Sequence, residues 1–183
     1  MICSNYCTAL AFASLVSPSS NQMGSAERNS VSISTSISLP ASAVVGSRRA
    51  GNLCFPNGSL RVSDFVRSTT EFDEMAQSAF SRRSSFQAGR ALLNHGAIVI
   101  TLKSMGARMC AKGYGLWGTG DRQSLSGNVS FQFGWSYTPT SSTPRTGSRT
   151  IEIKLSGKEA RSTETILPQA LEILAETIAN ETS

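Results

Sequence analysis

Apolar and polar residues alternate over residues 31–39, which read V-S-I-S-T-S-I-S-L. A period of two is typical of a strand with one buried face. Thr35 is the one polar member of the apolar side, and Pro40 would end the strand. Such an edge strand would join its own sheet or the sheet of a neighbouring subunit. A disordered segment with chance alternation explains the pattern equally well.

Four strands are predicted after residue 96. Residues 97–103 are apolar and β-branched, as in a central strand. A turn at 104–106 would lead into a second strand over 108–114. In the third strand, 128–137, large apolar residues alternate with small or polar ones, which indicates one buried face and one face toward water. The fourth strand spans 149–155.

Helical spacing of apolar residues occurs on both sides of these strands. Ser68-Thr-Thr-Glu71 has the form of a capping box and precedes a helix, which a second helical stretch over 84–94 would follow. A closing helix is predicted over 167–180. This order of elements predicts an α+β fold, with an antiparallel sheet of about four to five strands and flanking helices.

Composition divides the chain near residue 60. Residues 1–60 are Ser-rich and contain Glu27 as their one acid, whereas 61–183 have the composition of a single folded domain. We therefore predict a largely disordered arm before an α+β domain. The same opening also fits a plastid transit peptide that is removed on import.

The chain is basic, with a net charge of +5 and a pI of about 9.3, which favours acidic partners such as nucleic acid or anionic lipid. Residues 162–183 carry four acids and no base. Charges spread evenly over the surface are the alternative to one binding face. If there is such a face, its predicted polyanion contacts are Arg82, Arg83, Arg90, Lys103, Arg108 and Lys112.

A Gly-rich stretch over residues 113–121 lacks the Gly-Lys-Ser/Thr ending of a phosphate-binding loop. It predicts a flexible hairpin loop instead. Leu116 and Trp117 would be exposed in this loop, and we expect them to contact a partner or a lipid interface.

Catalytic chemistry is sparsely represented. His95 is the single histidine, and we expect it to be structural. The cysteines at 3, 7, 54 and 110 do not form a zinc or disulfide framework, so we expect free thiols in a reducing compartment, with Cys110 buried in a strand. Acylation of Cys3 or Cys7 is an alternative. We therefore expect neither an enzyme nor a catalytic residue, metal site, cofactor or small-molecule substrate.

In layout the chain resembles the matrix proteins of plant-infecting rhabdoviruses. The matching parts are the arm 1–60, the helical entry 71–94, the strands 97–103 and 128–137, and the closing helix 167–180. The resemblance implies a viral structural protein that self-associates and bridges the ribonucleoprotein to membrane and glycoprotein during virion assembly. It would be found in the virion and in the host-cell interior, at membranes or in the nucleus.

Under this resemblance the partners would be other copies of the chain, the nucleocapsid and an anionic membrane. Self-association would use the arm strand, whose apolar side is Val31, Ile33, Ile37 and Leu39.

Two rival functions remain. The first is a small β-rich binding module in a plastid, released by cleavage of the first fifty or sixty residues. The second is a single-stranded nucleic-acid binder that would stack bases on Phe131, Phe133 and Trp135.

Overall fold

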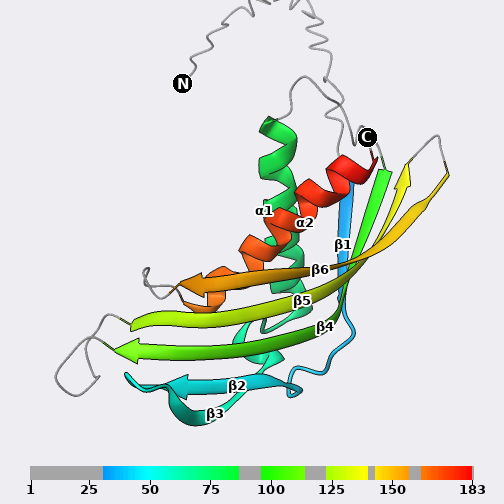
Figure 1. Cartoon of the computed structure of the whole chain (residues 1–183). Coiled ribbons are helices and arrows are strands. Elements are labelled where there is room, and N and C mark those ends of the chain that lie inside the picture. The colour runs from blue at the N-terminus through cyan, green and yellow to red at the C-terminus, as the bar shows by residue number, and fades with distance from the viewer. Residues whose placement is uncertain (1–30, 87–95, 114–122, 140–142, 157–161, 183) are drawn as a thin grey trace, which may run out of the picture.

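The structure is a computed structural model that describes residues 31–86, 96–113, 123–139, 143–156 and 162–182. These residues form one six-stranded sheet with two α-helices on one side of it (Figure 1). The α+β fold class predicted from the sequence is confirmed.

The elements follow one another in an order that places three strands before the first helix. The strands are β1 (Val31–Ile37), β2 (Val44–Ala50), β3 (Phe55–Arg61), β4 (Gly96–Gly113), β5 (Gln123–Pro139) and β6 (Arg145–Ser156). The helices are α1 (Thr69–Phe86) and α2 (Ile166–Thr182), with short 3-10 helices η1 (Val62–Asp64) and η2 (Thr163–Thr165).

Strand β4 lies at the centre of the sheet. One edge pairs with β5 in antiparallel fashion along its whole length, and β6 then pairs with β5. The other edge is shared, because β1 pairs in parallel with residues 96–102 and β2 pairs in parallel with residues 107–111. The sheet is therefore mixed rather than antiparallel. Parallel neighbours need a long crossover, which is supplied here by the segment of β3 and α1. The alternation of residues along one strand does not reveal whether its neighbour runs parallel or antiparallel.

Residues 31–60 belong to this sheet and not to an arm. Strands β1, β2 and most of β3 fall in this range, and β3 closes an antiparallel hairpin on β2. The domain boundary predicted at residue 60 is corrected accordingly. Ser enrichment had suggested a segment without a core, but the alternating serines of β1 occupy the face that points away from the helices.

Strand β4 is continuous where a turn at 104–106 was predicted. A register shift between Leu102 and Ser104 makes Lys103 an extra residue with no partner on β5. A β-bulge of this kind re-aims side chains without ending the strand. It brings Lys103 to the same face of the sheet as Ser104.

The helices bury the inner face of the sheet. Phe131 stacks on Phe133 with ring centroids 5.9 Å apart, and Phe65 meets Phe131 edge-on at 6.2 Å. The largest fully buried side chains come from both layers: Phe72, Phe131, Phe133, Ile98, Ile100, Leu102, Ile166, Leu167, Leu171, Leu174, Ile178 and Val62.

At the start of α1, one of the two hydrogen bonds of the predicted capping box is present, the one that the Ser68 hydroxyl accepts. The Glu71 N–H donates to Ser68 Oγ at 3.1 Å, while the Glu71 carboxylate accepts from the Arg67 N–H at 2.6 Å rather than from Ser68. Helix α1 continues unbroken to Phe86 where a second helix was predicted to begin at residue 84. The rest of that predicted helix lies outside the described residues.

The outer edge of β1 is closed by helix α1. The backbone N–H and the hydroxyl of Thr35 both donate to Asp73 Oδ1, at 2.8 Å and 2.6 Å. A strand edge that is covered in this way offers fewer free groups to another chain. Thr35, the one polar residue on the apolar side of β1, therefore connects the strand to α1 through hydrogen bonds.

Replacing Asp73 with alanine should destabilise the fold by about 2 kcal/mol, because two hydrogen bonds to a charged acceptor are lost and Thr35 is left unsatisfied. Urea denaturation of the full chain measures this. Glu74→Ala, at the exposed neighbouring position, is the control and should change stability little. Equal stabilities for the two variants would contradict the bracing role of Asp73.

A chain that begins at residue 61 should fail to unfold cooperatively. It lacks β1 and β2, so the buried residues of β4 lose the strands that pair with that edge. Thermal unfolding followed by circular dichroism, with the full chain as reference, tests this. A transition with an unchanged midpoint would show that the three strands are dispensable.

Candidate functional site

The outer face of the sheet, which points away from the helices, is lined by small, polar and basic side chains. The register places Ser47 of β2, Arg108 of β4, Asn128 of β5 and Lys154 of β6 side by side in one row across four strands. This face has two shallow grooves at positions where glycines have no side chain, and each groove contains one cation.

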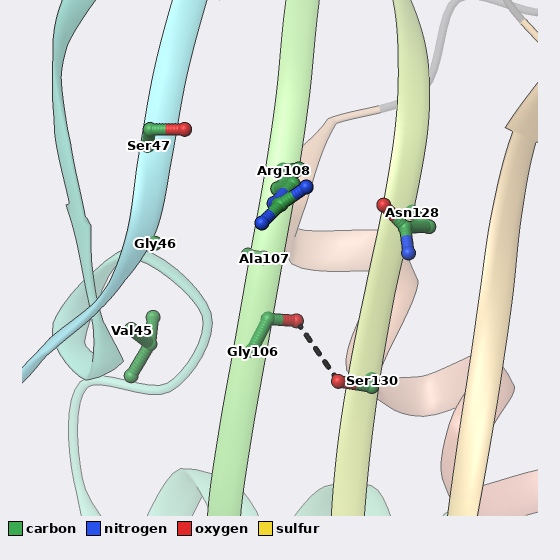
Figure 2. A pocket seen from close by; sticks show the side chains of 8 residues that line it. All are labelled: Val45, Gly46, Ser47, Gly106, Ala107, Arg108, Asn128 and Ser130. Carbon is green, nitrogen blue, oxygen red and sulfur yellow. Dashed lines mark hydrogen bonds between the residues drawn. The ribbon is translucent and has the colours of Figure 1, made fainter.

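The first groove, of about 440 Å³, lies between β2 and β5. Figure 2 shows Arg108 standing out from β4 at its centre, with Ser47 and Asn128 on either side. Its floor is held by a hydrogen bond in which Ser130 Oγ donates to the carbonyl oxygen of Gly106 at 3.3 Å. The groove is lined by Val45, Gly46, Ser47, Gly106, Ala107, Arg108, Asn128 and Ser130.

The second groove, of about 410 Å³, lies between β4 and β6 and holds Lys103. The Lys103 side chain crosses Gly134, where an added Cβ would lie 2.4 Å from the Lys103 Cε. The aliphatic stem thus rests on the backbone of β5. Hydroxyls surround the groove, from Thr101, Ser136, Thr146 and Ser148.

Charges of opposite sign are segregated between the two layers. The described strands carry nine cations against one acid, Glu152: Arg48, Arg49, Arg61, Lys103, Arg108, Lys112, Arg145, Arg149 and Lys154. The α-helices and 3-10 helices carry eight acids against Arg82 and Arg83: Asp64, Glu71, Asp73, Glu74, Glu164, Glu172, Glu176 and Glu181.

Three ion pairs join arginines to acids of the helical layer. Arg67 pairs with Glu164 at 2.7 Å and Arg82 with Glu172 at 3.1 Å, and Arg149 at the end of β6 pairs with Glu181. Within the part of the chain that the structure describes, Lys103 and Arg108 have no carboxylate within ion-pair distance. The cations in the two grooves of the outer face are therefore not neutralised by an ion pair, and Glu152 is the one described acid on that face.

The six predicted polyanion contacts are divided by the fold. Lys103, Arg108 and Lys112 lie together on β4. Arg82 lies on α1, paired with Glu172, and Arg83 follows it in the same helix. Arg90 lies outside the described residues, as do Leu116 and Trp117, the predicted apolar contact.

The aromatic residues proposed as base-stacking platforms lie in the core. Phe131 and Phe133 are 0% exposed and Trp135 is 6% exposed. Stacking requires an accessible ring face. The proposal that these three side chains bind single-stranded nucleic acid is therefore wrong.

The predicted assembly strand is used inside its own chain. Ile33, Ile37 and Leu39 are partly buried against the core, and Val31 starts β1 opposite Gly96. Of the two arrangements left open by the sequence, pairing within its own sheet is the one observed. An intermolecular role for this strand stays a prediction.

The hairpin of β2 and β3 carries a disulfide that the sequence did not indicate. Cys54 is bonded to Cys110, with Cα atoms 5.5 Å apart and a sequence separation of 56 residues. The parallel pairing of β2 brings the hairpin turn beside β4, where the Gly51 N–H donates to the Ala111 carbonyl at 3.0 Å. The prediction of free thiols is wrong for this pair, because strand pairing between distant segments decides which cysteines meet.

A third cavity, of about 450 Å³, lies on the helical side of the sheet near η1 and η2. Its rim carries Arg48 and Arg67, and also the carboxylates of Asp64 and Glu164. Its cations are thus matched by acids, unlike those of the outer face. We therefore place the candidate site on the outer face.

Metal and membrane-spanning features were also sought among the described residues. No three His, Cys, Asp or Glu side chains converge there in a way that could hold a metal ion. His95 lies outside them. None of the described helices is both long enough and apolar enough to span a bilayer.

Comparisons with known proteins identify no family. No protein-family model matches the sequence, and no curated protein matches it. One similar solved structure is a crystal structure of an uncharacterized protein, with 10% identity and a TM-score of 0.44 over 85% of this chain and 93% of that chain. A likeness this weak carries no functional argument.

Digestion of the unreduced protein should release one linked peptide pair containing Cys54 and Cys110, which reduction separates. Mass spectrometry detects the linked pair directly. Recovery of both cysteines in alkylated form, from protein treated with a thiol-alkylating reagent at lysis and under denaturing conditions, would contradict the bond.

Proposed function

We propose that this protein is a non-enzymatic binding protein that docks onto a phosphate-bearing anionic surface through the outer face of its sheet. The observation that carries the proposal is the segregation of charge. Lys103 and Arg108 stand in grooves of this face without a carboxylate partner among the described residues, while eight of the nine described acids belong to the helices and Glu152 alone lies on the outer face.

Such an arrangement suits a polyanion rather than a small substrate. The grooves are shallow and lined by hydroxyls and glycines, so they offer cations to an extended surface instead of enclosing a ligand. Neutralisation of several phosphates releases counterions, and a one-sided field speeds the encounter. In this proposal the protein uses no catalytic residue, cofactor, metal or small-molecule substrate.

A matrix role during virion assembly is the narrower form of this proposal. The basic outer face supports contact with a nucleocapsid or an anionic membrane. The Cys54–Cys110 disulfide favours an oxidising compartment, because such bonds are rare in the cytosol. It therefore fits the virion better than the reducing host-cell interior.

The plastid alternative is constrained by the sheet. Cleavage near residue 60 would remove β1, β2, most of β3 and the cysteine that bonds to Cys110. A transit peptide that leaves the observed fold intact would have to end before Val31. A plastid binding module therefore requires a leader of about half the predicted length.

Neutralising the cations of the outer face should weaken binding to a phosphate matrix. We expect Lys103→Gln and Arg108→Gln each to elute from phosphocellulose at lower NaCl than the native chain. The slope of log K against log salt should fall by about one per lost contact.

Arg82→Gln is the matched control, since it removes the same charge from a cation that already pairs with Glu172 on the helical layer. It should elute close to the native chain. An equal loss for all three variants would show that net charge, and not the outer face, governs binding. Retention unchanged in Lys103→Gln and Arg108→Gln would overturn the proposed function.

A further inference from the structure

Exposed apolar side chains gather on the β2–β3 hairpin. Of the five large apolar residues that are exposed in the described structure, three belong to it: Val44, Leu53 and Phe55, at 62%, 77% and 64% exposure. Leu53 and Phe55 flank Cys54 at the hairpin turn. The other two, Val99 and Ile173, lie singly on β4 and α2.

These side chains contribute nothing to the interior. Leu60 is the one residue of β3 that is buried, and the rest of that strand is exposed. Scattered apolar residues are ordinary on a protein surface, but a leucine and a phenylalanine on either side of one turn residue form a local patch. Such a patch requires an explanation other than packing.

The turn is held rigidly in this exposed position. Cys54 has a left-handed backbone with φ of 52° and is bonded to Cys110, while its N–H donates to the Gly51 carbonyl at 3.1 Å. Leu53 and Phe55 are thus fixed on both sides of an anchored residue. A preorganised contact loses less conformational entropy on binding than a mobile loop does.

Cations flank the turn on both faces of the hairpin. Arg49 is paired in register with Cys110 beside the outer-face row, and Arg48 borders the cavity on the helical side. Lys112 follows Ala111, which is the β4 partner of Ala50. The turn therefore combines two protruding apolar side chains with three nearby cations.

We propose that this turn is a membrane-insertion wedge for an anionic bilayer. Leu53 and Phe55 enter the boundary between headgroups and acyl chains, and Arg49 and Lys112 bind the lipid phosphates. The inference rests on the proposed function and names lipid as the source of the phosphate. Its basis is that apolar and basic groups lie together at the turn. Burial of apolar area and attraction to anionic headgroups both strengthen binding to a membrane interface.

A nucleic acid fits this turn less well. Its backbone offers phosphates to the cations but no aliphatic environment for Leu53. Stacking on Phe55 alone would leave the leucine in water. A bilayer interface accommodates both side chains, with the cations at the level of the headgroups.

Sedimentation of the full chain with vesicles tests the wedge. The vesicles contain phosphatidylcholine mixed with phosphatidylserine, and pure phosphatidylcholine vesicles provide the neutral reference. We expect Leu53→Ser and Phe55→Ser each to lower the partition coefficient on anionic vesicles, on the order of tenfold, because each removes apolar area from the interface. Ile173→Ser, an exposed apolar position on α2, is the matched control and should partition as the native chain does.

The result separates the wedge from the proposed function. Leu53→Ser and Phe55→Ser leave the charge unchanged, so their retention on phosphocellulose should equal that of the native chain. If they also partition like the native chain, or if Ile173→Ser loses as much, the wedge is overturned while the outer-face proposal stands. Circular dichroism verifies that each variant is folded.

Binding to two competing kinds of partner, a nucleic acid and a second copy of the chain, is measured with the same proteins. Tighter binding to a single-stranded oligonucleotide than to anionic vesicles, at equal phosphate concentration, would overturn the lipid assignment. A dimer in sedimentation velocity that Phe55→Ser dissociates, with vesicle binding intact, would instead assign the turn to self-association.

Discussion

The parallel pairing of β2 with β4 is the interaction on which both candidate surfaces depend. At Gly46 the two backbones approach so closely that an added Cβ would lie 1.7 Å from the Ala107 carbonyl oxygen, so only glycine fits there. This contact sets the register that places Ser47 beside Arg108. The same register brings the hairpin turn to Cys110. Without this pairing, the first groove would lose a wall and the turn would lose its anchor.

The division of the molecule into two layers explains the distribution of charge. The helices cover the inner face of the sheet with apolar side chains and turn their acids toward solvent, where Glu164 and Glu172 meet arginines. The outer-face cations Lys103 and Arg108 have no such layer opposite them. Concentrating like charge on one layer destabilises the fold through self-repulsion. The outer face, on which Glu152 is the one described acid, is then available to an anionic partner.

The outer-face row and the hairpin turn both include the paired strands β2 and β4. Arg49 and Cys110 connect them, since this pair lies two residues along the same ladder from the row that contains Arg108. In our proposal one anionic surface engages both, with the grooves binding charge and the turn binding acyl chains. The disulfide couples them mechanically, because it joins the turn to the strand that carries Lys103 and Arg108.

Local pattern was sufficient for part of this fold. The alternation in β5, the apolar run of β4, the cap at Ser68 and the stripe of α2 were predictable, because period and capping chemistry act between near neighbours. The basic residues of β4 were recognisable for the same reason. Whether they share a face with Arg82 was not, since a bulge at Lys103 and the ion pair of Arg82 with Glu172 depend on segments far apart.

By itself, therefore, the sequence determined the α+β class, the buried faces of the main strands and the basic character of β4. Only the tertiary structure decided that residues 31–60 enter the sheet, that two strands run parallel to β4 and that Cys54 meets Cys110. It also decided that Leu53 and Phe55 protrude. The physical reason is that parallel pairing and disulfide partners are chosen by long-range contacts, and these leave no periodic trace in either segment alone.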